Sequence, residues 1–156
     1  MDDITIRTAT LADVGTITAN NVAMAAETEG LQLDPAVVGS GTRQVIIDDQ
    51  RGTYFLAQRG GRVIGQLLIT REWSDWRDAW FWWIQSVYVA PDARGEGVYH
   101  TLHKYVEDQA RRAVGVCGLR LYVDRSNSVA RQVYLQLGLH ETNYEFMELV
   151  WPRKWG

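Results

Sequence analysis

Residues 86–106, SVYVAPDARGEGVYHTLHKYV, carry the clearest structural pattern of the chain. Apolar residues up to Pro91 are followed by the turn Arg94-Gly95-Glu96-Gly97 and then by apolar residues at helical spacing. A helix N-terminus presents unpaired backbone N–H groups and partial positive charge, so glycines just before it let a phosphate group approach the main chain. The stretch therefore predicts a strand, a phosphate-binding turn with Arg94 beside it, and a helix. A glycine-containing turn without a ligand is the alternative, since Gly-x-Gly is a common pattern.

The strand that enters this turn, Trp80 to Val89, is apolar on both of its alternating faces, which predicts a central strand covered on both sides. Thr10 and Asp13 form a capping box at the start of the first helix. The remaining elements are expected as strands at 4–8, 54–58, 63–69, 119–123 and 141–150, and as helices at 10–28, 35–47, 98–113 and 128–137. The order β-αα-βββ-α-β-α-β predicts an α/β fold, a mixed sheet with helices on its faces, in a single domain spanning residues 1–156.

Composition narrows the class of protein. The 156 residues carry 16 basic and 19 acidic side chains, which give a formal charge of −3. A nucleic-acid binder normally presents a basic stripe, so we expect no nucleic-acid partner. One cysteine, Cys117, excludes an internal disulfide framework and a Cys-based zinc site, and its neighbours predict a buried small residue. No apolar run reaches the roughly 18 residues of a membrane span, and the N-terminus lacks a signal-peptide pattern, so we expect a cytoplasmic protein without a membrane partner.

Two histidines lie close together on the helix that follows the glycine turn. His100 and His103 are three residues apart, as in some metal sites, but no third histidine or carboxylate follows at matching spacing. We therefore expect solvated helix residues and no metal.

A second segment, LYVDRSNSVARQVYLQLGL at 121–139, places Asn127 at a strand-to-helix junction and Tyr134 two turns along the helix. Together, the two segments resemble the signature of the GNAT superfamily of N-acyltransferases: Arg/Gln-x-x-Gly-x-Gly/Ala on the turn, then Asn-x-x-Ala-x-x-x-Tyr before a Gly-Phe-like pair. This sequence reads Arg94, Gly97 and Tyr99 in the first motif, and Asn127, Ala130, Tyr134, Gly138 and Leu139 in the second. The strand WWIQSVYV at 82–89 is similar to that of a bacterial group within the superfamily.

The resemblance implies that an amine attacks the thioester of acetyl-CoA directly, without an acyl-enzyme. It implies that Tyr134 protonates the departing thiolate, a transfer from a phenol of pKa about 10 to a thiolate of pKa about 8.5. It also implies that the pantetheine lies along the edge of the central strand, whose N–H groups polarise the thioester carbonyl. The expected cofactor-binding residues are Val87, Tyr88, Val89, Arg94, Gly95, Glu96, Gly97, Val98, Tyr99, Asn127 and Tyr134.

The sequence departs from the family pattern at two positions. Tyr99 stands where the family has Gly or Ala, so its ring must point away from the pyrophosphate. Gln85 stands where many relatives carry a Glu or His as general base, and an amide cannot accept a proton at neutral pH. Gln85 can only orient a water.

An alkylamine is almost fully protonated at pH 7, so the reaction needs a group that removes its proton or favours its neutral form. Glu72 or Asp75, just after the predicted third strand, is a candidate base that acts through water. Glu27 and Glu29 are candidates for the other wall of the amine pocket, and Trp73, Trp76 or Trp80 suits a cationic amine through cation–π attraction. The alternatives are solvated loop acids and a tryptophan cluster that belongs to the core or a dimer interface.

Two function hypotheses follow. The first is an acetyl-CoA-dependent N-acetyltransferase that acts on a primary amine of a small molecule or protein, and the alternative is a non-catalytic acyl-CoA-binding domain. An acyl donor other than acetyl-CoA is a further alternative, because Tyr99 and the tryptophans could reshape the acyl pocket. The apolar tail residues Val150, Trp151 and Trp155 are compatible with a homodimer. The acceptor amine carries no recognisable motif.

Overall fold

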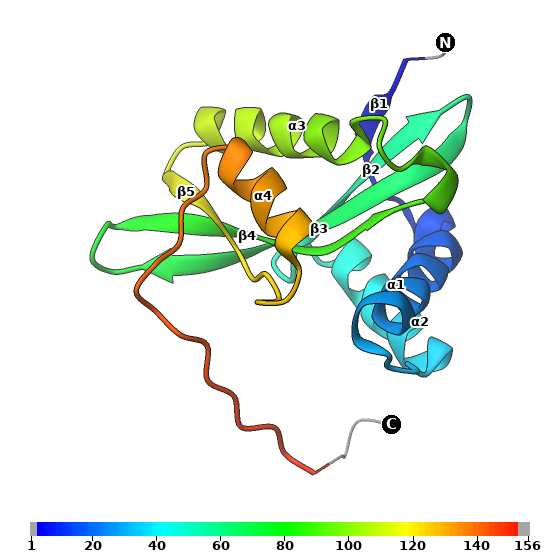
Figure 1. Cartoon of the computed structure of the whole chain (residues 1–156), viewed down its shortest axis with the longest axis horizontal. Helices are drawn as coiled ribbons and strands as arrows, with labels where there is room; N and C mark the ends of the chain where they lie inside the picture. Colours follow the sequence, from blue (N-terminus) through cyan, green and yellow to red (C-terminus); the bar gives the residue numbers. More distant parts are fainter. Residues whose placement is uncertain (1–2, 153–156) are drawn as a thin grey trace. The chain divides into compact units, whose positions relative to one another are not determined.

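The computed structural model describes residues 3–152, and the chain divides into two compact units, residues 1–121 and 122–156. The first unit is built on a five-stranded sheet with the spatial order β1-β2-β3-β4-β5 (Figure 1). Its elements are β1 (Thr5–Thr8), α1 (Val14–Glu29), α2 (Pro35–Ile47), β2 (Thr53–Arg59), β3 (Arg62–Ser74), β4 (Ala79–Val89), α3 (Val98–Arg112) and β5 (Val116–Leu121).

The sheet is mixed. β1 to β4 pair antiparallel with their neighbours, and β5 lies parallel to β4 because α3 carries the chain back across the sheet. This arrangement confirms the predicted α/β fold with a mixed sheet.

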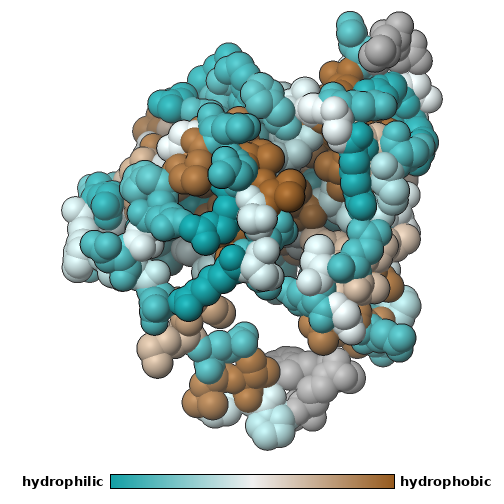
Figure 2. All heavy atoms as spheres, viewed as in Figure 1, coloured by the Kyte–Doolittle hydropathy of each residue, from teal (hydrophilic) through white to brown (hydrophobic). Residues whose placement is uncertain are grey.

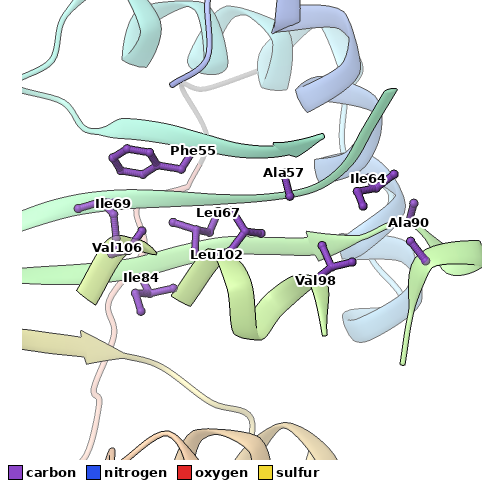
Figure 3. Packing of buried hydrophobic residues seen from close by; sticks show 11 residues of the cluster. Phe55, Ala57, Ile64, Leu67, Ile69, Ile84, Ala90, Val98, Leu102 and Val106 are labelled. Atoms are coloured by element: carbon purple, nitrogen blue, oxygen red, sulfur yellow. The ribbon is translucent and has the colours of Figure 1, made fainter. Parts of the chain in front are cut away.

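Two layers of helix cover the faces of this sheet. α3 packs on one face, where Val98, Leu102 and Val106 meet side chains of β2, β3 and β4 (Figure 3). On the other face Ile17 of α1 packs against strand residues that include Leu56 and Leu68. β4 lies inside the sheet, between β3 and β5, but most of its residues are half-buried, and the most deeply buried strand is β3 in the middle of the order. The prediction that β4 is a central strand covered on both sides is therefore met only in part, because the buried strand residues against which the helices pack belong mainly to β2 and β3.

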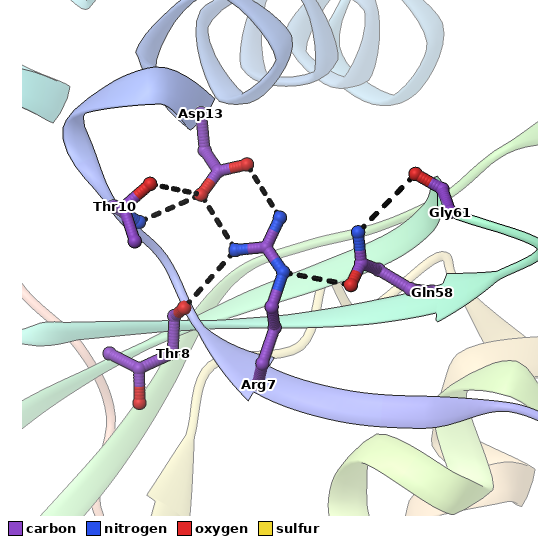
Figure 4. A network of polar contacts seen from close by, with 6 residues as sticks. All are labelled: Arg7, Thr8, Thr10, Asp13, Gln58 and Gly61. Carbon is purple, nitrogen blue, oxygen red and sulfur yellow. Dashed lines mark hydrogen bonds and ion pairs between the residues drawn. The ribbon is translucent and has the colours of Figure 1, made fainter.

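The junction between β1 and α1 is fixed by Asp13. Its carboxylate accepts the Thr10 backbone N–H at 2.7 Å and two hydrogen bonds from the Arg7 guanidinium, at 2.7 and 2.8 Å (Figure 4). The predicted capping box is present, although it opens a short 3₁₀ turn at Leu11–Asp13 before α1 begins at Val14. Thr10 and Asp13 thus set the direction in which α1 leaves the sheet.

Two of the five observed strands, β3 and β5, differ by more than one residue from the ranges predicted. β3 runs on to Ser74, because its last residues pair with the first residues of β4 in a long hairpin. β5 begins at Val116, and the prediction that Cys117 is buried is wrong. Its side chain is exposed because β5 is the last strand in the sheet order; the thiol donates to the Trp80 carbonyl at 3.3 Å.

The second unit contains the helix α4 (Ser128–Gln136). Asn127 caps it by accepting the Ala130 backbone N–H at 3.0 Å, and Gly138 follows its end with a φ of 92°, a conformation that favours glycine. The predicted last strand at 141–150 is wrong: within residues 3–152 no strand pairs with this segment, and a strand without a neighbour is not stable. Its large apolar side chains, which include Phe146 and Met147, are exposed, and Figure 2 shows that brown, apolar residues form part of the surface of the protein.

Candidate functional site

The edge of β4 is the first feature of the site. β4 and β5 pair from Trp80 to Ile84, where β5 reaches its last residue, Leu121. β4 continues to Val89, so the backbone of residues 85–89 extends beyond the ladder that β5 provides. A strand edge without a ladder partner presents N–H and C=O groups that can bind an extended ligand carrying amide groups.

A β-bulge lies in this extension. Tyr88 pairs with Gln66 and Gln85 pairs with Leu68, so Ser86 and Val87 together oppose a single residue of β3. Ser86 has a φ of 49°, in the left-handed region that residues with a Cβ atom rarely adopt. The bulge therefore turns the backbone of β4 away from regular strand geometry beside the unpaired edge.

The glycine turn leads from β4 into the N-terminus of α3. Gly95 and Gly97 each have a φ of 79°, and a Cβ atom added to either would meet no neighbour within 4 Å. The space in front of the turn is therefore open, and the first N–H groups of α3 have no partner within the helix. Glu96, whose charge would oppose a phosphate, pairs with Arg59 of β2 at 2.5 Å. The turn has the geometry of an anion site.

Tyr99 does not obstruct this turn. Its ring packs against the core on the α3 side of the sheet, and its hydroxyl lies 3.1 Å from Nδ1 of His103, one helical turn further on. His103 is buried, and burial lowers its pKa. The prediction that His103 is a solvated residue is therefore wrong, because the face of α3 that carries it packs inward; His100 is exposed, as expected.

Arg94 contacts both β4, which the sequence predicts to bind the cofactor, and α1, which it predicts to line the amine pocket. Its Nε donates to the Val89 carbonyl at 2.9 Å, and a terminal nitrogen donates to the Glu27 carboxylate at 2.8 Å. The guanidinium also lies over the Tyr88 ring, 5.6 Å from its centroid. The structure thus brings Arg94, expected to bind the cofactor, next to Glu27, expected to bind the amine. Glu29 is the last residue of α1 and is exposed.

Gln85 lies on the α1 and α2 face of β4, opposite Leu68. Its side-chain Nε2 donates to the Thr70 hydroxyl at 2.5 Å, and it is half-buried. This contact leaves the amide carbonyl as the acceptor that a water or an amine could use.

The predicted base and aromatic wall lie apart from this edge. Glu72 belongs to β3, four residues or about 13 Å from the position opposite Gln85, and it forms an ion pair with Arg120 at 2.5 Å. Trp73 and Trp80 pair edge-to-face at 5.0 Å, about 20 Å along the strand from Val87. Asp75 and Trp76 are exposed in the turn between β3 and β4. The structure does not bring these residues to the unpaired edge.

The second motif lies in the second unit. Asn127 is the exposed cap of α4, and Tyr134 is a half-buried residue of the same helix whose backbone carbonyl accepts the Leu139 N–H at 3.1 Å. The spacing of the motif is thus that of one capped helix.

A polar hollow of about 560 Å³ lies on the first unit, lined by residues that include Arg7, Asn20 and Tyr88. Of the residues predicted for the site, only Tyr88 lines it. Across residues 3–152 there is no group of three His, Cys, Asp or Glu side chains that could hold a metal ion, and no helix there is both long and apolar enough to cross a membrane.

Comparisons with known proteins agree with this geometry. Residues 23–139 match the family model described as acetyltransferase (GNAT) family. A protein of Clostridium difficile 630 described as a possible acetyltransferase is 35% identical, with a TM-score of 0.90 over 96% of this chain and 99% of its own. No protein in a search of curated proteins matches the chain.

Two more distant structures share the fold. A predicted acetyltransferase of Clostridium acetobutylicum, solved with acetyl-CoA, is 15% identical with a TM-score of 0.75 over 95% of this chain and 96% of its own. A ribosomal-protein-alanine N-acetyltransferase of Brucella melitensis biovar Abortus 2308 is 17% identical with a TM-score of 0.75 over 96% of this chain and 100% of its own. The family match over most of its length and the 35% identity to the clostridial protein show that this chain belongs to the GNAT family of acetyltransferases.

Proposed function

We propose that this protein transfers an acetyl group from acetyl-CoA directly to a primary amine of a small molecule or a protein. The observation that carries the proposal is the unpaired edge of β4 next to an open glycine turn at the N-terminus of α3. Such an edge suits the two amides of a pantetheine chain, and such a turn suits a pyrophosphate.

The residues present fit acetyl-CoA. The backbone N–H groups of residues 95–99 would hold the pyrophosphate, because both glycines leave the approach open and Tyr99 points into the core. Arg94 would add a charged contact after leaving Glu27. Val87 and Val89 would hydrogen-bond the pantetheine through their main chain, with Tyr88 between them. For Asn127 and Tyr134, in the second unit, a cofactor-binding role is what the family resemblance implies. Acetyl-CoA, when bound, supplies the activated acetyl group.

The reaction joins the amine nitrogen to the carbonyl carbon and breaks the bond from carbon to sulfur. The bulged backbone of β4 stabilises the negative charge that develops on the carbonyl oxygen. Tyr134 donates its phenolic proton to the departing thiolate, as the family resemblance implies. The amine loses its proton to water that the Gln85 carbonyl orients, and Glu27 and Glu29 attract the cationic amine. We do not assign Glu72 as the base, because it forms an ion pair with Arg120. It also lies about 13 Å along β3 from Leu68, the residue that pairs with Gln85.

Three further points belong to the proposal. Both units act as one transferase domain, supported by the family match across their boundary at residue 121. The protein acts in a bacterial cytoplasm, supported by the clostridial relative and by the supply of acetyl-CoA there. It forms a homodimer, supported by the exposed apolar residues Val150 and Trp151; Trp155 lies outside the described residues.

The alternative is a non-catalytic acyl-CoA-binding domain, which the amide of Gln85 in place of a base favours. Thiol release from acetyl-CoA, measured with a panel of small amines and of peptides with free N-termini, separates the two. We expect turnover by the wild type, and Tyr134→Phe should lower kcat at least tenfold while the acetyl-CoA Kd, measured by calorimetry, stays unchanged.

Tyr144→Phe is the matched control, because Tyr144 is an exposed tyrosine of the same unit outside the motif. Acetyl-CoA binding without thiol release from any amine would favour the binding domain. An unchanged kcat in Tyr134→Phe would exclude Tyr134 as the proton donor. Propionyl-CoA and succinyl-CoA, tested beside acetyl-CoA, determine the acyl preference.

A further inference from the structure

Gln66 is a polar residue in an otherwise apolar run of β3. The run reads VIGQLLIT over residues 63–70, and the Gln66 side chain is completely buried. A buried amide is strongly destabilising unless its donors and acceptor find partners. The hydrogen-bond partners of Gln66 therefore indicate its role in the structure.

The Gln66 amide has three partners, on two other elements. Its Oε1 accepts from Asn20 at 2.9 Å, and its Nε2 donates to the Asn21 side chain at 3.0 Å. The same Nε2 donates to the backbone carbonyl of Ser86 at 3.3 Å. Asn21, itself buried, donates onward to the Tyr54 hydroxyl at 3.1 Å. Two asparagines of α1 thus orient one glutamine, and the glutamine holds the bulge of β4.

The contact with Ser86 fixes the direction of the next N–H group. A trans peptide unit is planar, and its C=O and N–H point in opposite directions; there is no cis peptide bond among the described residues. Because the Ser86 carbonyl faces Gln66, the Val87 N–H points away from Gln66. Ser86 also has a φ of 49°, an unfavourable conformation for a residue with a Cβ atom, so the bulge depends on contacts that hold it.

We propose that Gln66 is a positioning residue of the transferase: by holding the Ser86 carbonyl, it aims the Val87 N–H at the thioester carbonyl of acetyl-CoA. The inference rests on the proposed function, because it concerns how the edge of β4 polarises the acetyl group of bound acetyl-CoA. Gln66 touches no substrate and acts only through the peptide between Ser86 and Val87. Asn20 and Asn21 keep its amide in the required orientation.

The test compares variants at the two ends of this network. Gln66→Met keeps a side chain of similar volume and removes the donor to Ser86, whereas Tyr54→Phe removes the far hydrogen bond to Asn21 and leaves the contact with Ser86. We expect Gln66→Met to lower kcat for acetyl transfer by about 10- to 100-fold, less than the 100- to 1,000-fold typical of a deleted oxyanion donor. The KM for acetyl-CoA should stay within about threefold, and Tyr54→Phe should keep the wild-type kcat.

A second readout separates positioning from a general structural role. The infrared stretching frequency of ¹³C-labelled acetyl-CoA reports how strongly its carbonyl is polarised when bound. The wild type and Tyr54→Phe should show the same lowered frequency, and Gln66→Met should return towards the value in solution. If Gln66→Met does not fold, Asn20→Ala removes one anchor of the amide, and we expect the same changes on a smaller scale.

The outcomes are distinguishable. A wild type that neither binds acetyl-CoA nor turns it over overturns the proposed function, and this inference with it. A wild type that is active, beside folded Gln66 and Asn20 variants with unchanged kcat and carbonyl frequency, overturns the inference alone. An equal fall in kcat for Gln66→Met and Tyr54→Phe would also overturn it. The fall would then result from a general disturbance of the buried hydrogen bonds and not from loss of the contact between Gln66 and the Ser86 carbonyl.

Discussion

Asp13→Asn tests the junction that carries α1 away from the sheet. The Asp13 carboxylate is largely buried and receives two hydrogen bonds from Arg7, which, as the largest cause, lower its pKa from 3.8 to about 2 (Figure 4). At about 1.4 kcal/mol per pKa unit, the ionised form stabilises the fold by about 2 kcal/mol. We therefore expect Asp13→Asn to lower the free energy of unfolding by about 2 kcal/mol at pH 7, and Tm by about 4 to 8 °C.

The dependence on pH follows from the direction of the shift. Because the pKa of Asp13 is lowered in the folded protein, its stabilisation is complete above the ordinary pKa of 3.8. It is lost as the pH falls from about 4 towards 2, where the wild type and Asp13→Asn should converge in stability.

Urea denaturation followed by circular dichroism at pH 7, 5, 4 and 3 measures both effects. The matched control is Asp92→Asn, because Asp92 forms a similar two-bond contact with Arg62 in full exposure to solvent. We expect no measurable loss of stability there, since water and salt screen an exposed pair. An Asp13→Asn variant as stable as Asp92→Asn, or a difference from the wild type that is as large at pH 3 as at pH 7, would refute the reasoning.

Two further predictions concern the cofactor side of the first unit. Gly65→Ala should destabilise the fold by about 1 to 3 kcal/mol and weaken CoA binding, because its Cβ would lie 2.7 Å from the Val98 side chain at the start of α3. Urea denaturation and calorimetry measure the two effects, and Gly15→Ala, with no neighbour within 4 Å, should show neither. Glu27→Gln frees Arg94 and should tighten CoA binding by up to about fivefold in calorimetry; weaker binding would contradict the proposed exchange of partners.

The glycine turn and its surroundings could be predicted from the sequence because their signals are local. Pro91 ends a strand, and Gly95 and Gly97 adopt positive φ values before a helix, so these residue types carry the conformation themselves. The position of β4 inside the sheet was also predictable from its two apolar faces, although most of its residues are half-buried rather than covered on both sides.

The sequence-based predictions that were wrong concern residues whose environment depends on parts of the chain that are distant in the sequence. Residues 141–150 have a strand-like sequence, but a strand requires a neighbour, and periodicity does not supply one. His103 is polar, but it lies on the face of α3 that packs inward, where the Tyr99 hydroxyl is 3.1 Å from its Nδ1. Gln66 was missed for the same reason. Its signal was a lone amide in an apolar strand, and its partners lie 20 and about 45 residues away.

Thermal-shift titration with acetyl-CoA and free CoA, with ATP and NAD as controls, tests most directly whether the unpaired edge of β4 and the glycine turn form an acyl-CoA site. At about 100 times its Kd, a ligand adds about 2.7 kcal/mol, which corresponds to about 5 to 10 °C for a chain of this size. We predict that shift for the two CoA species and not for ATP or NAD. A folded protein whose Tm neither CoA species raises would contradict the account.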